Sequence, residues 1–318
     1  MKAIGLSTYG PPEVLHPIVL PDPHPGPGEV RIRVRAAGVN PVDAMLREGL
    51  LAEMNRGLEP PFVPGLEVAG AVDEIGAGVC SEFELAVGTD VVGFVNSRGH
   101  HGGYSENIVV PAASVTRMPA NANFAEAASF LNNALTARNA LDALALEKGS
   151  TLLVSGAAGS VGGYLVQLAV LDGLRVVAVA GPSDEEMVRS FGAAVVLPRG
   201  DDIAMRVSEA VPGGVDAVAD AALLHEQIVP AIRDGGSIGV FRKWNGKPGR
   251  GITVHALNVR ERSTDHLAIV RLREQVESGL LTVRVAETFP AEQAIAAHRR
   301  MELSGLRGRI ILEFPAGH

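Results

Sequence analysis

The sequence contains little cysteine and no concentrated positive charge. Its one cysteine, Cys80, excludes an intramolecular disulfide framework and a cysteine-rich zinc site, and such cysteine usage is typical of the cytosol. The net charge is −8 without a dense run of Lys or Arg, so neither a nucleic acid nor an anionic membrane is an expected partner. The first residues lead into a strand-like pattern rather than the apolar core of a signal peptide, and we therefore predict a cytoplasmic protein.

Hydrophobic residues, by contrast, make up 47% of the chain, which excludes a largely disordered protein. At about 150 residues per domain, the 318 residues predict two domains. The stretch 151–171 carries no charge and resembles a membrane span in composition. Its cluster of glycines is more typical of a nucleotide-binding turn than of a helix that faces lipid, so no membrane partner is expected.

The same stretch indicates a buried strand, a glycine-rich turn and the start of a helix. The strand is expected at Thr151–Ser155, and a second strand follows at Leu174–Ala180, which completes a βαβ unit of about 30 residues. Such a turn places a phosphate against backbone N–H groups at a helix N-terminus. We therefore expect dinucleotide binding, although glycine-rich turns without ligands are also common.

The turn matches the dinucleotide fingerprint G-x-G-x-x-G at its second and third glycines, which are Gly159 and Gly162, whereas Ala157 occupies the first position. Gly159 lets the backbone approach a pyrophosphate, and Gly162 permits close packing of the helix on the strand. The predicted cofactor-binding residues of this turn are Ala157, Ala158, Gly159, Ser160, Val161 and Gly162.

Two patterns divide the chain near residue 122. Residues 1–122 are rich in Pro, Gly and short apolar runs, which indicates a compact β domain, and Pro21–Gly28 is expected to form a stiff surface connection. From residue 123 strands and helices alternate, which is typical of a doubly wound parallel sheet. Because the final strand-like segment is expected to return to the first domain, we predict a discontinuous domain of residues 1–122 and 265–318 around a domain of residues 123–264.

The expected elements follow from apolar periodicity. In the first domain they are strands at Gly28–Ala36, Val68–Ile75, Asp90–Val95 and Arg309–Phe314 and a helix at His266–Glu277. In the second domain they are a helix at Phe124–Asp142 and strands at Thr151–Ser155, Arg175–Ala180, Ala194–Leu197, Ala217–Ala221 and Ser237–Phe241.

Different short motifs are spread over nearly the whole chain, at Gly10–Leu15, Ala37–Asp43, Pro61–Gly70, Gly102–Glu106, Ala157–Gly162 and Gly308–Leu312. Their order resembles the medium-chain dehydrogenase/reductase superfamily, and within it the zinc-free, zeta-crystallin-like quinone oxidoreductase branch. The resemblance implies an α/β fold with a GroES-like β domain, a Rossmann domain and an active site in the cleft between them.

Zinc-binding members of that superfamily carry a cysteine ligand near Asn40 and a histidine near Leu66, and neither residue type here binds zinc. Their structural zinc also needs four cysteines. The adjacent pair His100–His101 lacks a third ligand and indicates a solvated loop, so we expect no metal. Without a Lewis acid, alcohol oxidation loses its usual stabilisation of the alkoxide, whereas hydride delivery to an electrophilic quinone or enone needs less help.

The resemblance implies that Asn40 and Thr136 are catalytic. The Asn40 amide can donate to a carbonyl oxygen that gains charge as hydride arrives, or it caps a turn before Pro41. Thr136 lies near the nicotinamide in the family, or it bonds to its own helix backbone. Met45 stands where many relatives have tyrosine, which leaves the acceptor open, and Asp43 is expected to hydrogen-bond the turn. We identify no general acid, and the proton is expected from water.

NADPH is the expected cofactor rather than NADH. An NAD site has a carboxylate at the end of its second strand, but here Gly181 follows that strand. Ser183 and Arg199 can instead contact a 2′-phosphate, with the Arg199 guanidinium supplying charge. The alternatives are a capping box from Ser183 to Glu186, which would open a helix at Asp184–Phe191, and a solvated loop arginine.

Phe241 completes the predicted cofactor site. It ends the fifth strand of the sheet, at an edge that borders the nicotinamide in the family, and its alternative role is that of a buried core residue.

Together these features predict an oxidoreductase that transfers hydride from NADPH to a quinone or an α,β-unsaturated carbonyl without zinc. The partner is a small electrophilic molecule, and we expect a homodimer. One alternative is an enoyl-thioester reductase, although no basic patch for a phosphopantetheine carrier is evident. The other is a non-catalytic NADPH-binding protein of the sensor or crystallin-like kind.

Overall fold

The computed structural model describes residues 1–97, 101–303 and 305–315, and they divide into two compact units. The first unit comprises residues 1–132 and those from 263 onward, and the second comprises residues 133–262. The first junction lies within helix α3 (Leu131–Leu144). Each unit contains a hydrophobic core of its own.

The first unit is built on a mainly antiparallel sheet, in which only the pairing of β14 with β15 is parallel among the described strands. In the part of the chain that the structure describes, its seven strands follow the order β14-β15-β3-β4-β5-β7, with β6 paired to β3. Their bounds are β3 Glu29–Val39, β4 Glu67–Ile75, β5 Asp90–Phe94, β6 Asn107–Pro111, β7 Val115–Arg117, β14 Val285–Pro290 and β15 Arg309–Glu313. Strand β3 alternates as predicted, since Val30, Ile32 and Val34 are buried in the core while Arg31 and Arg33 point outward.

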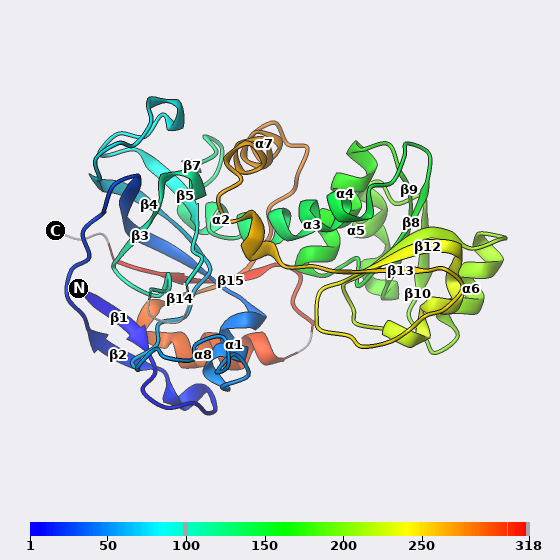
Figure 1. Ribbon diagram of the computed structural model, residues 1–318, viewed down its shortest axis with the longest axis horizontal. Helices are drawn as coiled ribbons and strands as arrows, with labels where there is room; N and C mark the ends of the chain where they lie inside the picture. Colours follow the sequence, from blue (N-terminus) through cyan, green and yellow to red (C-terminus); the bar gives the residue numbers. More distant parts are fainter. Residues whose placement is uncertain (98–100, 304, 316–318) are drawn as a thin grey trace. The chain divides into compact units, whose positions relative to one another are not determined.

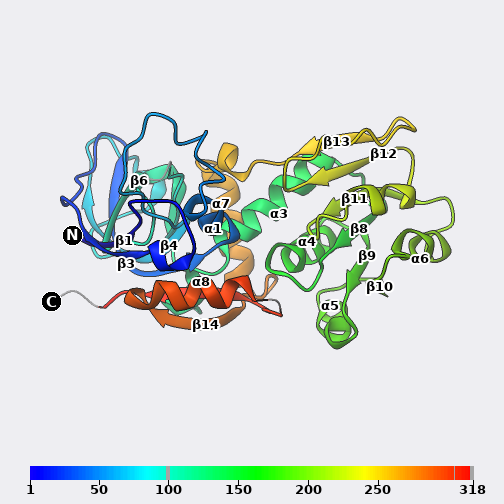
Figure 2. The same cartoon turned by 90° about the horizontal axis from the view of Figure 1, so that it is seen from below.

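The C-terminal segment returns to this sheet, as predicted. Strand β15 pairs antiparallel with β3, so that Ile310 lies opposite Val39. Figure 1 shows the orange and red C-terminal elements beside the blue N-terminal strands, and Figure 2 shows α8 along β14. The remaining elements of the unit are β1 Lys2–Gly5, β2 His16–Val19, α1 Pro41–Arg47, α2 Phe124–Ala127, α7 His266–Glu277 and α8 Ala294–Glu302. Short 3-10 turns lie at Pro12–Val14, Ser81–Phe83, Ala112–Ser114 and Ala291–Gln293.

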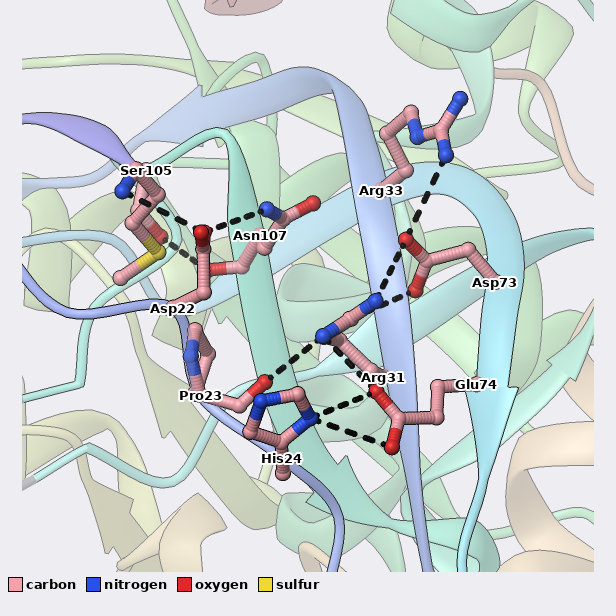
Figure 3. A network of polar contacts seen from close by, with 10 residues as sticks. Asp22, Pro23, His24, Arg31, Arg33, Asp73, Glu74, Ser105 and Asn107 are labelled. Carbon is pink, nitrogen blue, oxygen red and sulfur yellow. Dashed lines mark hydrogen bonds and ion pairs between the residues drawn. The ribbon is translucent and has the colours of Figure 1, made fainter.

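The proline-rich connection has no regular structure, as predicted, and side chains hold it to the sheet (Figure 3). Arg31 donates from Nε and Nη2 to the carboxylate of Asp73 at 2.8 and 3.2 Å, and from Nη1 to the Pro23 carbonyl at 3.0 Å. The Arg31 and Asp73 side chains are 17% and 14% exposed, so water screens this pair only partly. Glu74 contacts both Arg31 and the ring of His24 at the edge of the cluster.

We therefore predict that Arg31→Ala lowers the free energy of unfolding by about 1–3 kcal/mol, because it removes a two-pronged, partly buried contact. Arg33→Ala is the matched control: its side chain is 51% exposed and 3.6 Å from Asp73, so its effect should stay within about 0.5 kcal/mol. Urea titration at unchanged m value measures both effects, and equal losses would contradict this account.

The second unit contains a parallel sheet. Within its described residues, six strands follow the order β10-β9-β8-β11-β12-β13, and every pairing is parallel. Numbered along the chain, the order is 3-2-1-4-5-6, that of a Rossmann domain, which confirms the predicted doubly wound sheet. The strands are β8 Thr151–Ser155, β9 Arg175–Ala180, β10 Val195–Pro198, β11 Val215–Asp220, β12 Ile232–Val240 and β13 Thr253–Ala256. The helices are α3, α4 Ser160–Leu171, α5 Glu185–Ser190 and α6 Ile203–Ala210, with 3-10 turns at Pro182–Asp184, His225–Gln227, Val229–Ala231 and Val259–Arg262.

Two predicted elements differ most from the observed bounds. The helix expected at Phe124–Asp142 is broken between α2 and α3, where the Ser129 hydroxyl donates to the Glu126 carbonyl at 2.7 Å and takes up a carbonyl that a continuing helix would use. Strand β12 begins at Ile232, whereas the prediction placed its start at Ser237. The prediction missed the first half of the strand because that half resembles a turn in sequence and contains Gly235 at a φ of +70°.

The uncharged stretch 151–171 forms β8, the glycine turn and the 12-residue helix α4, as predicted. Among residues 1–97, 101–303 and 305–315, no helix has the length and apolar character that a membrane crossing requires.

Candidate functional site

The glycine turn connects the carboxyl end of β8 to the first residue of α4. Gly156 has a φ of +62°, which favours glycine, and Gly159 is the N-cap of α4 with an extended φ of −73°. The sharp bend that the first fingerprint glycine usually supplies is therefore made at Gly156, one residue before Ala157. Gly156 belongs to the same glycine-rich run and stands one position before the first position of the fingerprint.

The fingerprint glycines Gly159 and Gly162 differ in their surroundings. A Cβ on Gly162 would lie 2.1 Å from the Gly156 carbonyl oxygen and 2.8 Å from the Ala157 Cα, distances that no packed side chain adopts. A Cβ on Gly159 would meet the Gly156 oxygen at 3.2 Å, and no other atom outside its chain neighbours lies within 4 Å of it in the described residues. Gly162 is thus required by the fold, whereas Gly159 leaves space in front of the helix.

Buried side chains hold the turn against the end of the neighbouring strand β11. The Ser155 hydroxyl donates to Asp220 Oδ1 at 2.7 Å and accepts from the Ala222 backbone N–H at 2.8 Å. Asp220 also accepts from the backbone N–H groups of Leu224 and His225. Ser155 and Asp220 are fully buried, so they fix the loop after β11 beside the turn. Sequence reasoning missed both residues, because the strand pattern alone gives no sign of this contact.

These features fit a dinucleotide pyrophosphate. The first N–H groups of α4 have no acceptor within the helix, and the helix dipole adds positive potential at this end. Because Gly159 has no side chain, an anion can approach those N–H groups at this position. The turn lies at the carboxyl ends of β8 and β11, where the strand order reverses and where such sheets bind ligands. Ala157, Ala158, Ser160 and Val161 form its backbone.

Arg199 and Asp184 meet above Gly181, beyond the ends of β9 and β10. A Cβ on Gly181 would lie 2.7 Å from Arg199 Nη2 and 3.2 Å from Asp184 Oδ2. The two side chains are 3.5 Å apart, with Arg199 65% exposed and Asp184 6% exposed. The guanidinium therefore faces solvent at the strand end where a ribose-binding carboxylate commonly stands, and Asp184 reaches the same place from the next turn.

Ser183 lies in the 3-10 turn Pro182–Asp184 and is exposed. The predicted capping box is wrong: α5 begins at Glu185 with Asp184 as its N-cap, and no side-chain cap bond forms there. The cause is the preceding turn, in which the Asp184 N–H donates to the Gly181 carbonyl at 2.9 Å and displaces the helix start by one residue.

Phe241 directly follows β12 and is half-buried at the same carboxyl edge of the sheet. Thr136 lies in α3 and is also half-buried. The roles assigned to both residues stay predictions.

In the first unit, Asn40 is the N-cap of α1 and is only 1% exposed. Its Oδ1 accepts from Asn132 Nδ2 at 2.8 Å. Its Nδ2 donates to the Gly38 carbonyl at 3.2 Å and to Glu67 Oε1 at 3.5 Å. The amide is therefore held in one orientation, and its longest contact is the one to Glu67. Asn40 thus stands at the N-cap position and contacts the turn through its backbone, to which the Asp43 N–H donates at 2.9 Å. The donor role toward an acceptor stays a prediction.

Two buried carboxylates surround Asn40. Asp43 accepts from the Asn40 N–H at 2.7 Å, which confirms its predicted contact with the turn, and burial raises the pKa of Asp43 to about 6. Glu67 accepts from the Asn132 N–H at 2.9 Å and lies 3.7 Å from Arg309 Nε. Burial also raises the pKa of Glu67, and the positive charge of Arg309 opposes that shift.

Leu66 is buried beside Glu67, and Met45 is half-buried on α1. The described residues contain no group of three or more His, Cys, Asp or Glu side chains that could hold a metal ion. Of the histidine pair, His101 is described, and His100 lies outside the described residues.

Known proteins share this architecture. Residues 26–120 match the alcohol dehydrogenase GroES-like domain, and residues 191–312 match the zinc-binding dehydrogenase family. A probable oxidoreductase from Mycobacterium abscessus is 30% identical, with 99% of each chain covered and a TM-score of 0.81. The chain belongs to the medium-chain dehydrogenase/reductase superfamily, with a GroES-like unit and a Rossmann unit.

Curated relatives include enzymes of activated carbonyl and quinone reduction. A 2-methylene-furan-3-one reductase of Solanum lycopersicum is 28% identical over 98% of this chain and 79% of its own. An NADPH-dependent alkenal/one oxidoreductase, chloroplastic, of Arabidopsis thaliana is 29% identical with the same coverage. A quinone oxidoreductase of Lama guanicoe is 27% identical over 98% of this chain and 97% of its own.

Solved structures point the same way. A mycobacterial protein complexed with NADPH is 28% identical, with coverage of 99% and 100% and a TM-score of 0.85. The CurK enoyl reductase is 25% identical, with coverage of 99% of each chain and a TM-score of 0.87. These similarities support an oxidoreductase that uses a nicotinamide cofactor.

The glycine turn yields a matched pair of substitutions. We predict that Gly159→Val folds normally but weakens binding of the nicotinamide cofactor by at least about 30-fold, or about 2 kcal/mol, because the valine occupies the space before the helix N-terminus. Gly162→Val should instead lower the free energy of unfolding by more than about 4 kcal/mol, since its Cβ has no room. Calorimetric binding and thermal unfolding separate the two effects. Unchanged affinity in Gly159→Val would place the cofactor elsewhere.

Proposed function

We propose that this chain is a zinc-independent, NADPH-dependent oxidoreductase that reduces quinones or α,β-unsaturated carbonyls. The observation that carries the proposal is the glycine turn at the carboxyl end of β8, where Gly159 leaves open the space that a pyrophosphate requires. The relatives named as quinone oxidoreductases and as an alkenal/one oxidoreductase support the acceptor class. A bound nicotinamide cofactor supplies the hydride.

The choice of NADPH rests on Arg199. Its guanidinium lies above Gly181, 65% exposed, and can take a 2′-phosphate in a bidentate contact. Ser183, exposed in the adjoining turn, can add a hydroxyl donor to the same phosphate. Asp184 partly neutralises Arg199 at 3.5 Å and offers an acceptor to a ribose hydroxyl, which weakens the preference for NADPH without reversing it. Phe241 and Thr136 are proposed to flank the nicotinamide.

On the acceptor side, we assign charge stabilisation to Asn40. Its Nδ2 contacts Glu67 at 3.5 Å, a weaker contact than the one to Gly38 at 3.2 Å, so this N–H is the one that an acceptor oxygen beside it can engage. Residue types at positions 40 and 66 suit an acceptor that needs no Lewis acid, because an amide and an alkyl side chain do not bind zinc. The proton that balances the hydride comes from water, since the neighbouring Tyr104 hydroxyl already donates to Asp43.

We further propose that residues 1–122 with 265–318 form the catalytic domain and that residues 123–264 bind the cofactor. The acting form is proposed to be a cytoplasmic homodimer.

The test is NADPH oxidation by the purified chain with a panel of a quinone, an α,β-unsaturated ketone and an enoyl-CoA. Turnover of the first two supports the proposal. Turnover of the enoyl-CoA alone would establish an enoyl-thioester reductase, which the similarity to the CurK enoyl reductase favours as the second candidate. NADPH binding without any turnover would establish a non-catalytic nucleotide-binding protein.

We predict that the purified protein contains no stoichiometric zinc and keeps its activity in a chelator, because Leu66 and Asn40 offer no zinc ligand. Elemental analysis and assay after dialysis against the chelator measure this. One zinc per chain, with activity lost on its removal, would overturn the zinc-independent mechanism.

Arg199→Ala should weaken NADPH binding about tenfold, or about 1.4 kcal/mol, while NADH binding changes little. The loss is at the low end for a charge-assisted contact because the side chain is largely exposed and Asp184 already pairs with it. Arg189→Ala, which removes an exposed arginine from the adjacent helix α5, is the matched control. Both dissociation constants are measured at one salt concentration. Equal losses for the two cofactors would mean that Arg199 supports the fold or stacks on the adenine.

A further inference from the structure

A chain of buried polar side chains runs through the first unit from α8 to the Asn40 turn. Arg47 Nη1 lies 3.3 Å from His298 Nδ1, His298 Nε2 lies 3.2 Å from the Tyr104 hydroxyl oxygen, and that hydroxyl lies 3.3 Å from Asp43 Oδ2. All four residues are buried, with at most 2% of their surface exposed. The Tyr104 and His298 rings meet edge to face at 5.9 Å, so packing as well as hydrogen bonding fixes their positions.

The chemistry of Arg47 sets the direction of every bond in this chain. A guanidinium only donates, so His298 Nδ1 must accept and the ring proton must be on Nε2. His298 Nε2 then donates to the Tyr104 oxygen, and Tyr104 uses its own hydrogen for Asp43. Burial and the nearby Arg47 lower the pKa of His298 to about 3, which keeps the ring neutral, and burial raises the pKa of Tyr104, which keeps its hydroxyl protonated.

Asp43 receives this chain and joins two turns. Besides Tyr104, it accepts from the Asn40 N–H at 2.7 Å and from the Gly65 N–H at 2.9 Å. Gly65 has a φ of +107°, and its Cβ position is filled by Gly103 and Tyr104, so this turn also has little freedom. One carboxylate therefore ties the start of α1, which carries Asn40, to the turn that leads into Leu66 and Glu67.

The other end of the chain reaches the surface. Arg47 Nη2 pairs with Glu48 Oε1 at 2.6 Å and with Glu302 Oε1 at 2.7 Å, and these carboxylates are 43% and 39% exposed. Arg47 Nε also donates to the Gly10 carbonyl at 3.1 Å. The guanidinium is thus fixed by groups on three separate segments, and it cannot turn away from His298 without breaking them.

We propose that Asp43, Tyr104 and His298 are positioning residues: they hold the Asn40 turn in the geometry in which its amide meets the acceptor. The inference rests on the proposed function, in which Asn40 stabilises charge on the acceptor oxygen. The Asn40 side chain is oriented by Asn132 and Glu67, but its backbone is held by Asp43. Loss of the ionised Asp43 would release the turn and leave the fold of the surrounding sheet in place.

The arrangement makes the acceptor step pH-dependent. The groups that face Asp43 are Tyr104, Arg309 on β15 and Glu67 on β4, with His298 and Arg47 behind Tyr104. A protonated Asp43 would present a donor to the backbone N–H groups that now donate to it. Because burial raises the Asp43 pKa to about 6, kcat/KM for the acceptor should fall on the acid side of that value. The Tyr104 hydroxyl stabilises the ionised carboxylate, so its removal raises this pKa further.

The experiment is the pH profile of kcat/KM for the acceptor in Tyr104→Phe, with Tyr9→Phe as a matched control at a 40% exposed tyrosine. We expect the acid limb to move up by about one pH unit in Tyr104→Phe, which gives about a threefold loss at pH 6.5 and almost none at pH 8.5. The Kd of NADPH should stay unchanged. Tyr9→Phe should keep the wild-type profile. A uniform loss at every pH, or no change, would overturn the proposal.

A second measurement follows the protonation of Asp43 without enzyme turnover. Infrared difference spectra report the carbonyl stretch of a protonated carboxylic acid, and Asp43→Asn identifies the band of Asp43 against that of Glu67. The band should titrate near pH 6 in the wild type and about one unit higher in Tyr104→Phe. An acid limb that moves while this band does not would also overturn the proposal. If the wild type turns over no acceptor, the proposed function fails, and the band alone then decides whether Tyr104 controls Asp43.

Discussion

The close approach of helix α4 to the turn before it is the constraint on which the cofactor unit depends. With a Cβ at position 162 only 2.1 Å from the Gly156 oxygen, the helix can start where it does only if that side chain is missing. This approach brings the helix N-terminus directly to the end of β8 and opens the space before Gly159. Ser155 and Asp220 then fix the loop of β11 beside it. The surface in front of α4 is therefore made mostly of backbone, and its shape depends on the missing side chains of Gly159 and Gly162.

The first unit is organised in the opposite manner, by polar side chains placed in the core. Removing a carboxylate from water costs several kcal/mol unless partners offset it. For Asp43, hydrogen bonds from backbone N–H groups and from the Tyr104 hydroxyl offset the cost of burial. For Glu67, the Asn132 N–H and the charge of Arg309 offset this cost. Each of these partners comes from a different segment of the chain. The network thus specifies how the α1 turn, β4, β15 and α8 meet, a register that apolar packing alone would leave less defined.

Sequence patterns predicted the regular parts of the fold well. Helix His266–Glu277 and strands Thr151–Ser155 and Arg175–Ala180 match their predicted bounds, because each combines clear periodicity with clear ends. The errors fall where a local bond overrides periodicity, as at Ser129 between α2 and α3, or where glycine enters a strand, as in β12. The Asp43–Tyr104–His298 chain lies beyond such reasoning, because its members are separated by 61 and 194 positions and no local pattern relates them.

The groups around Asn40 can be compared with the absence of zinc ligands from the sequence. Arg309 lies 3.7 Å from Glu67, and its charge also acts on Asp43, so the two buried carboxylates share one cationic counterpart supplied by the protein. The two positions that hold zinc ligands in zinc-binding relatives carry an amide and an alkyl group here, and neither group binds a dication. The Asn40 amide is thus a neutral donor beside two buried carboxylates that accept from backbone N–H groups. Such a donor can follow charge that develops on an acceptor oxygen without binding the ground state strongly, which is the condition under which a hydrogen bond accelerates a reaction.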